Sequence, residues 1–180
     1  AVLSGPSFAQ EVAQEMPTNV TLACRDAEIS HMLQQAFHRP FFRVYSSDDI
    51  MGVELGGALK NVMAIAAGGL SGMGFGYNTQ CALVTRGLAE ITRLGIHLGA
   101  DPRTFAGLSG LGDLVLTCMG NLSRNRTVGE RIGRGESLSE ALNMRQVAEG
   151  VETSRSAYQL AKKNSIDMPI VEQVYRILHE

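Results

Sequence analysis

The stretch Val53-Glu54-Leu55-Gly56-Gly57-Ala58-Leu59-Lys60-Asn61-Val62 places a lysine inside an otherwise apolar helix. Apolar side chains cover most of the helical circumference, so no solvated face is left for Lys60. Lysine is rarely buried unless it is paired, and burial disfavours its charged form, which suits proton exchange near neutral pH. Gly56 stands one turn earlier on the same face, where a small molecule could approach the backbone. We interpret Lys60 as a catalytic acid and base rather than as a lysine that extends to the surface.

Four motifs in a fixed order carry a resemblance to a known family. They are GPSFA at 5–9, VELGGALKN at 53–61, GLGDL at 110–114 and SRNR at 123–126. The chain resembles the bacterial NAD(P)-dependent glycerol-3-phosphate dehydrogenases, which interconvert dihydroxyacetone phosphate and sn-glycerol 3-phosphate. That family begins with a glycine-rich nucleotide-binding segment, which we do not find here. We therefore expect this chain to be a piece of a longer enzyme and to be inactive alone.

The chain divides into an α/β part and a helical part. β-branched runs predict strands at 1–4, 19–23 and 41–45, separated by helices at 6–14 and 26–37. After Ser47 the β signals stop, and Ser47-Asp48-Asp49 can cap the long helix that carries Lys60. A glycine-rich break at 68–76, a second long helix at 78–98 and a loop at 107–112 follow, and shorter helices are expected near 124–133, 137–144, 152–164 and 171–178.

The predicted fold class is mainly α. Residues 1–46 would be the α/β remnant of a Rossmann-type sheet, the end of the NAD(P)-binding domain. Residues 47–180 would form an all-helical C-terminal domain for substrate binding and catalysis. By resemblance, this second domain is similar to that of 6-phosphogluconate dehydrogenase.

Composition excludes several partners. The 180 residues include 16 basic and 18 acidic ones, a net charge of −2, which gives no general attraction to nucleic acid or anionic membranes. The longest apolar run, 62–70, is too short to cross a bilayer. Cys24, Cys81 and Cys118 are widely spaced, and we expect reduced, mostly buried thiols in a cytoplasmic protein.

The resemblance implies roles for individual residues. Lys60 would be catalytic, and NAD or NADP would be the cofactor, with most of its site outside this chain and no metal. The substrate-binding residues would be Ser7, Lys60, Asp113, Ser123, Arg124 and Asn125. The cofactor-binding residues would be Gly5, Ala9, Arg124, Val147 and Glu149.

The residues themselves leave simpler interpretations open. Asp113 could cap the helix that follows it. Ser123 can cap a helix while Arg124 presents a planar fork suited to phosphate. The arginines of segment 121–135 could instead form a solvated surface, and an RNA site there would lack aromatic residues on which to stack bases.

Two weaker patterns are rejected as sites. Gly72-x-Gly74-x-Gly76 follows a helix rather than a strand, so we interpret it as a turn and not as a dinucleotide loop. His31 and His38 lack a third ligand nearby, so we expect surface residues and no metal.

Two rival functions remain at this stage. A related hydroxyacid or keto-acid dehydrogenase would share the helical domain and the lysine but would need a carboxylate clamp. A non-catalytic oligomerisation module would use the apolar helices around 50–70 and 78–98 as a subunit interface. For the enzyme itself, a homodimer is the expected assembly. The favoured function is reduction of dihydroxyacetone phosphate to glycerol 3-phosphate for glycerophospholipid synthesis.

Overall fold

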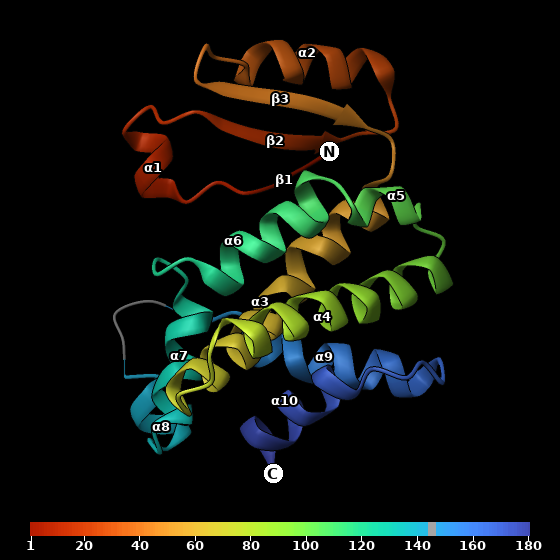
Figure 1. Cartoon of the computed structure of the whole chain (residues 1–180). Coiled ribbons are helices and arrows are strands. Elements are labelled where there is room, and N and C mark those ends of the chain that lie inside the picture. Colours follow the sequence, from red (N-terminus) through yellow and green to blue (C-terminus); the bar gives the residue numbers. More distant parts are fainter. Residues whose placement is uncertain (144–146) are drawn as a thin grey trace.

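The computed structural model describes residues 1–143 and 147–180, and it places a small sheet at one end of a helical body (Figure 1). Strand β1 (Val2–Ser4) pairs antiparallel with β2 (Thr18–Ala23), and β2 pairs parallel with β3 (Phe42–Ser47). The strand order β1-β2-β3 makes a mixed sheet. The predicted strands are confirmed to within two residues at each end.

Two helices belong to the sheet region. Helix α2 (Ala27–Phe37) begins where predicted, because the Asp26 side chain accepts hydrogen bonds from two backbone N–H groups of its first turn, at 3.0 Å each. Helix α1 (Ala9–Ala13) is shorter than the predicted 6–14. Phe8, which precedes it, is extended, and its apolar side chain cannot cap the helix. Val20, Leu22 and Val44 form a small separate core beneath α2.

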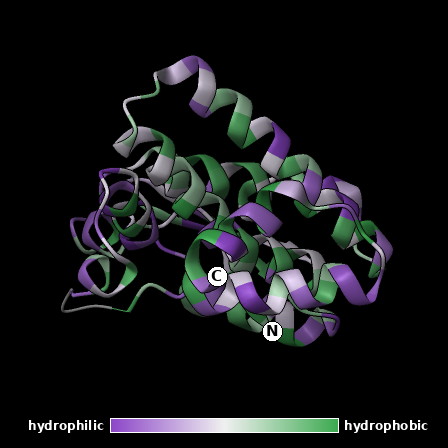
Figure 2. Ribbon diagram, turned by 90° about the horizontal axis from the view of Figure 1, so that it is seen from below, coloured by the Kyte–Doolittle hydropathy of each residue, from purple (hydrophilic) through white to green (hydrophobic). Residues whose placement is uncertain are grey.

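The helical body is built around α3 (Ile50–Gly72), which begins after Asp49 caps the Gly52 N–H at 2.9 Å. Hydrophobic and hydrophilic residues alternate along its surrounding helices (Figure 2), and the apolar residues of most helices join one core cluster. The other elements are α4 (Tyr77–His97), α5 (Pro102–Phe105), the π-helical turn η1 (Leu108–Gly112), α6 (Asp113–Met119), α7 (Arg124–Gly133), α8 (Leu138–Ala141), α9 (Gly150–Lys163) and α10 (Pro169–His179).

The predicted loop at 107–112 is therefore wrong over most of its length. Residues 108–112 form the π-helical turn η1, in which Ser109 and Gly110 are buried. A Cβ added to Gly110 would lie 2.2 Å from the Phe105 carbonyl oxygen, so the glycine allows the turn to pack closely on α5. The predicted helix 137–144 is shorter in the structure, where α8 ends at Ala141, and only its last predicted residue, 144, lies outside the described part of the chain.

Helix α3 contains an 18-residue window that is long and apolar enough to cross a membrane, by length and composition alone. The expectation that the longest apolar run, 62–70, is too short to cross a bilayer therefore does not hold for the helix as a whole. Half of that window is buried inside the protein, and Val53, Val62 and Met63 are fully enclosed. In this structure α3 is the central helix of the core.

Glycines near the end of α3 allow close contact between α3 and α7. The predicted break of the helix at 68 is wrong. The helix continues to Gly72. A Cβ on Gly68 would lie 1.9 Å from the Arg126 carbonyl oxygen of α7, and one on Gly129 of α7 would lie 1.9 Å from the Ile65 carbonyl oxygen. The two backbones approach this closely because neither residue has a side chain. The actual turn is 73–76, with Gly74 at a positive φ of 84°, as expected for this glycine-rich segment.

Gly68→Ala should destabilise the protein by about 1–3 kcal/mol or more, because the added methyl group meets backbone that cannot move aside. Gly69→Ala is the matched control, since its Cβ would lie 3.9 Å from the Gly129 carbonyl oxygen, an ordinary contact. It should be neutral or stabilising by about 0.5–1 kcal/mol because alanine favours a helix. Denaturant unfolding of both variants tests this close contact, and equal effects would contradict it.

The proposed division into residues 1–46 and 47–180 stays a prediction. It is supported by the end of β3 at Ser47, by the start of α3 at Ile50, and by the two separate buried clusters.

Candidate active site

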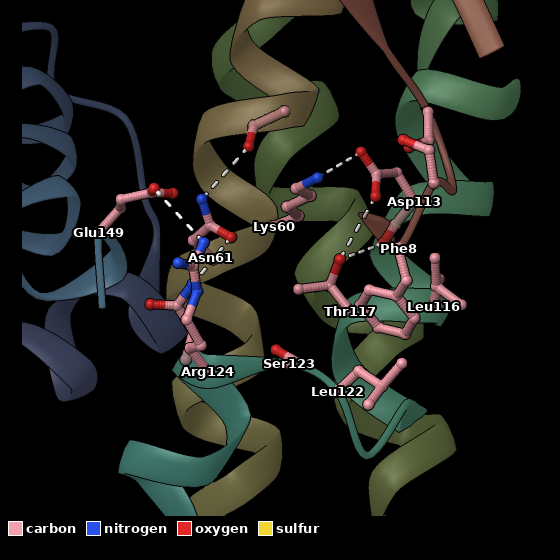
Figure 3. Close-up of a pocket in the computed structure, with 14 residues that line it drawn as sticks. Phe8, Lys60, Asn61, Asp113, Leu116, Thr117, Leu122, Ser123, Arg124 and Glu149 are labelled. Carbon is pink, nitrogen blue, oxygen red and sulfur yellow. Dashed lines mark hydrogen bonds and ion pairs between the residues drawn. The ribbon is translucent and has the colours of Figure 1, made fainter. Parts of the chain in front are cut away.

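A cavity of about 240 Å³ lies between the segment that follows β1, residues 5–8, and the helices α3, α6 and α7. Figure 3 shows side chains from these elements and from the start of α9 directed toward one another. The lining residues are Gly5, Ser7, Phe8, Gly57, Lys60, Asn61, Asp113, Leu116, Thr117, Leu122, Ser123, Arg124, Asn125 and Glu149. Segments far apart in the sequence therefore form one polar cavity.

Lys60 forms an ion pair with Asp113 at the side of this cavity. Lys60 Nζ donates to Asp113 Oδ2 at 2.5 Å, and Figure 3 shows the two side chains reaching across from α3 and α6. The lysine side chain is 21% exposed, whereas that of Asp113 is only 3% exposed. Lys60 is therefore half-buried rather than fully enclosed, and it is paired with a buried carboxylate beside the cavity that it lines.

Asp113 is the first residue of α6, but its carboxylate faces the lysine instead of capping the helix. Thr117 Oγ1 donates to the Asp113 carbonyl oxygen at 2.6 Å and lies 3.4 Å from Oδ1, and Ser4 Oγ donates to Oδ2 at 3.4 Å. Burial raises the pKa of the Asp113 carboxyl group, while Lys60 and these hydroxyl groups oppose that shift. The pair is therefore held by contacts from the sheet and from two helices.

The glycine that leaves the helix backbone accessible from the cavity beside Lys60 is Gly57, not Gly56. Gly56 packs against η1, since a Cβ there would lie 2.4 Å from the Ser109 carbonyl oxygen. Gly57 lines the cavity, and a Cβ there would lie 2.9 Å from Ser4 Oγ. The prediction that a ligand approaches the backbone at Gly56 is therefore wrong, because η1 covers that residue. Gly57 is the position at which a ligand could approach.

The start of α7 presents positive charge to the cavity. Ser123 caps the helix as predicted, accepting from the Arg126 N–H at 3.2 Å. Arg124 extends beside Glu149, with an N–O distance of 3.8 Å, and both side chains remain well exposed, at 44% and 60%. Backbone N–H groups of a first helical turn have no intrahelical acceptor. Together with the guanidinium they form a surface suited to phosphate.

Two asparagines connect this region to the lysine helix. Asn125 Nδ2 donates to Asn61 Oδ1 at 3.0 Å, and the Gly150 N–H donates to Asn125 Oδ1 at 2.9 Å. Asn61 Nδ2 lies 3.5 Å from the Gly57 carbonyl oxygen. Asn125 is 6% exposed, so its amide group lies inside the protein at the cavity wall.

The structure brings most of the predicted site residues together. Ser7, Lys60, Asp113, Ser123, Arg124 and Asn125 all line the cavity, as do Gly5 and Glu149. Ala9 and Val147 do not line it: Ala9 is exposed, and Val147 is 74% exposed. Their predicted contact with the cofactor stays a prediction.

Several cavity residues were not predicted as site residues, namely Phe8, Gly57, Asn61, Leu116, Thr117 and Leu122. Thr117 could have been found, because it follows Asp113 by four residues and so shares its helical face. The apolar residues Leu116 and Leu122 give no such signal.

The cysteines and histidines lie apart from this chemistry. The three thiols are free, but only Cys118 is buried, whereas Cys24 is half-buried and Cys81 is exposed, so the expectation of mostly buried thiols is wrong for two of them. His31 and His38 are exposed, as expected. Within residues 1–143 and 147–180, no group of three or more metal-ligating side chains occurs.

Comparison with known proteins gives a consistent result. The family described as NAD-dependent glycerol-3-phosphate dehydrogenase C-terminus matches residues 49–180, and the corresponding N-terminus family matches residues 1–30. Glycerol-3-phosphate dehydrogenase (NAD(P)+) of Citrifermentans bemidjiense is 62% identical over 181 residues, which cover 100% of this chain and 54% of that protein. The corresponding protein of Lawsonia intracellularis is 60% identical over 99% of this chain and 50% of its own length.

Solved structures agree with this result. The crystal structure of glycerol-3-phosphate dehydrogenase from Coxiella burnetii has a TM-score of 0.97 and 47% identity, covering 99% of this chain and 55% of the other. That of the Saccharomyces cerevisiae enzyme has a TM-score of 0.89 and 32% identity over the same shares. The chain spans about half the length of the relatives it matches. It belongs to the NAD-dependent glycerol-3-phosphate dehydrogenase family.

Proposed function

We propose that the full-length protein containing this chain reduces dihydroxyacetone phosphate to sn-glycerol 3-phosphate, reversibly and with NADH or NADPH, for glycerophospholipid synthesis. The observation that carries this proposal is the placement of the Lys60–Asp113 pair and the phosphate-suited start of α7 around one cavity. A general acid and an anion site that line one small cavity are what a phosphorylated ketone requires.

Lys60 supplies the proton in this proposal. When bound, the reduced nicotinamide supplies a hydride to the ketone carbon. As negative charge develops on the carbonyl oxygen, the Lys60 ammonium stabilises it and donates a proton, giving the alcohol. Asp113 holds the ammonium in place through the 2.5 Å contact. In the oxidative direction neutral Lys60 takes the proton from the hydroxyl group.

Arg124 and the first turn of α7 hold the phosphate and so position the carbonyl group. Correct orientation of a bound substrate can contribute roughly 7–11 kcal/mol to lowering a barrier at the limit. Ser7 and Asp113, which also line the cavity, would contact the glycerol oxygens.

The residues present fit part of a dinucleotide site. Gly5 has a positive φ of 147° and lines the cavity next to Phe8 and the exposed Ala9. Glu149 lines the cavity next to the exposed Val147. Gly5, Ala9, Arg124, Val147 and Glu149 would hold the nicotinamide end of the cofactor, and the rest of its site would lie outside this chain.

Oxidation of NADH and NADPH by the purified full-length protein tests the proposal. We expect oxidation to depend on dihydroxyacetone phosphate, to be much weaker with dihydroxyacetone, and to be undetectable with 2-keto acids. The 180-residue chain alone should not turn over, because it lacks a pyrophosphate-binding loop. Preference for a keto acid would reject the proposal in favour of a related dehydrogenase.

We also propose a cellular location and an oligomeric state. A cytoplasmic location is supported by the three free thiols. A homodimer is supported by the exposed apolar residues Met73, Phe75 and Ile177, and Met51 of α3 is exposed as well. The expected use of helices 50–70 and 78–98 as the interface stays a prediction. Sedimentation of the full-length protein distinguishes a dimer from a monomer.

A further inference from the structure

The start of α9 is capped from another helix. Glu149, which precedes α9, makes no side-chain capping bond of its own. The Gly150 N–H instead donates to Asn125 Oδ1 of α7 at 2.9 Å, inside the protein. A first-turn N–H group that is buried needs an acceptor, and a helix is destabilised when that group has none. Asn125 thus performs for α9 the task that an N-cap residue usually performs for its own helix.

The same amide also reaches the lysine helix. Asn125 Nδ2 donates to Asn61 Oδ1 at 3.0 Å, and Asn61 is the neighbour of Lys60 in α3. One buried side chain therefore links the starts of α7 and α9 to the middle of α3.

Gly150 is fitted to this junction. A Cβ there would lie 2.6 Å from the Asn61 carbonyl oxygen and 2.9 Å from Asn125 Oδ1. The absence of a side chain lets the α9 backbone approach both asparagines. Outside the junction, Glu149 comes within 3.8 Å of Arg124, so the buried bond and the exposed ion pair join the same two helix ends.

We infer that Asn125 is a positioning residue that sets the place of Glu149, and through it the affinity for the cofactor. The inference rests on the proposed function, which gives Glu149 a cofactor contact. It assigns the Asn125 side chain a role within the protein, in addition to the substrate contact that the family resemblance implies. Loss of the bond from Gly150 should displace Glu149 and weaken its contribution.

A double-mutant cycle on cofactor binding tests the inference. The dissociation constant of NADPH is measured by fluorescence titration of the full-length protein without substrate, for the wild type, Asn125→Ala, Glu149→Gln and the double variant. Asn125→Ala should raise the constant about fivefold or more. In that background Glu149→Gln should have almost no further effect, because residues that act through one another are not additive. Equal effects of Glu149→Gln in both backgrounds would overturn the inference.

Further variants separate positioning from folding. Asn125→Asp keeps an oxygen acceptor for the Gly150 N–H but loses the Nδ2 donor to Asn61 Oδ1, so we expect its NADPH dissociation constant to rise clearly less than that of Asn125→Ala. A loss equal to that of Asn125→Ala would show that this bond is not the cause. Asn78→Ala, at an exposed asparagine in α4, is the matched control and should combine additively with Glu149→Gln. Failure of the wild type to bind either NADPH or NADH would instead contradict the proposed function.

Discussion

Lys60→Ala in the full-length protein is expected to lower kcat for dihydroxyacetone phosphate about 100-fold or more. The expected change in cofactor affinity is small. The lysine acts mainly where charge develops on the substrate oxygen, so its loss should appear in kcat rather than in binding. Steady-state kinetics, together with a direct NADPH titration, measure both effects.

Removal of Lys60 also leaves Asp113 buried without its cation, and breaking a buried ion pair commonly costs about 3–5 kcal/mol. Folding must therefore be checked by circular dichroism and thermal unfolding. Lys60→Arg supplies the second arm, because it keeps a cation beside Asp113. A guanidinium remains charged at all accessible pH values and is a poor proton donor. A folded Lys60→Arg variant with more than about a tenth of wild-type turnover would make Lys60 structural.

Arg124→Lys should raise the KM for dihydroxyacetone phosphate by about tenfold or more, although the charge is kept. An ammonium group cannot provide the two parallel N–H donors with which a guanidinium binds phosphate. The loss should be much smaller with unphosphorylated dihydroxyacetone, which offers no phosphate to either side chain. Comparison of kcat/KM for the two substrates measures the difference.

The matched control is Arg134→Lys at the other end of α7, about 15 Å away along the helix axis. Arg134 pairs with Glu130 and is 63% exposed, outside the cavity lining. Its replacement should leave both substrates unaffected. If Arg124→Lys lowered kcat/KM equally for the phosphorylated and the unphosphorylated substrate, Arg124 would not bind the phosphate.

Elements with strong local signals were predictable from the sequence. Helix α7 begins at the predicted residue because Ser123 caps its first turn. Asp26 and Asp49 cap α2 and α3 in the same way. These signals lie within a few residues of the structure they determine, so no knowledge of the rest of the fold is needed.

Features that depend on distant contacts were not predictable. A glycine in a helical pattern can be a break or a close-packing position, and only the approach of α7 identifies Gly68 as the second kind. Likewise, the contact of η1 with Gly56 decides that Gly57 opens the cavity. The ion-pair partner of Lys60, Asp113, lies 53 residues away in the sequence. Only the family resemblance, and no local pattern, indicated that Asp113 belongs to the site.

The structure of the full-length protein with cofactor and glycerol 3-phosphate tests the central claim most directly. The account predicts the phosphate at Arg124 and the first turn of α7. It places the C2 hydroxyl oxygen within about 2.6–3.2 Å of Lys60 Nζ, the distance at which a proton can be transferred. A substrate bound in this cavity with its phosphate away from Arg124, or with C2 out of reach of Lys60, would contradict the account.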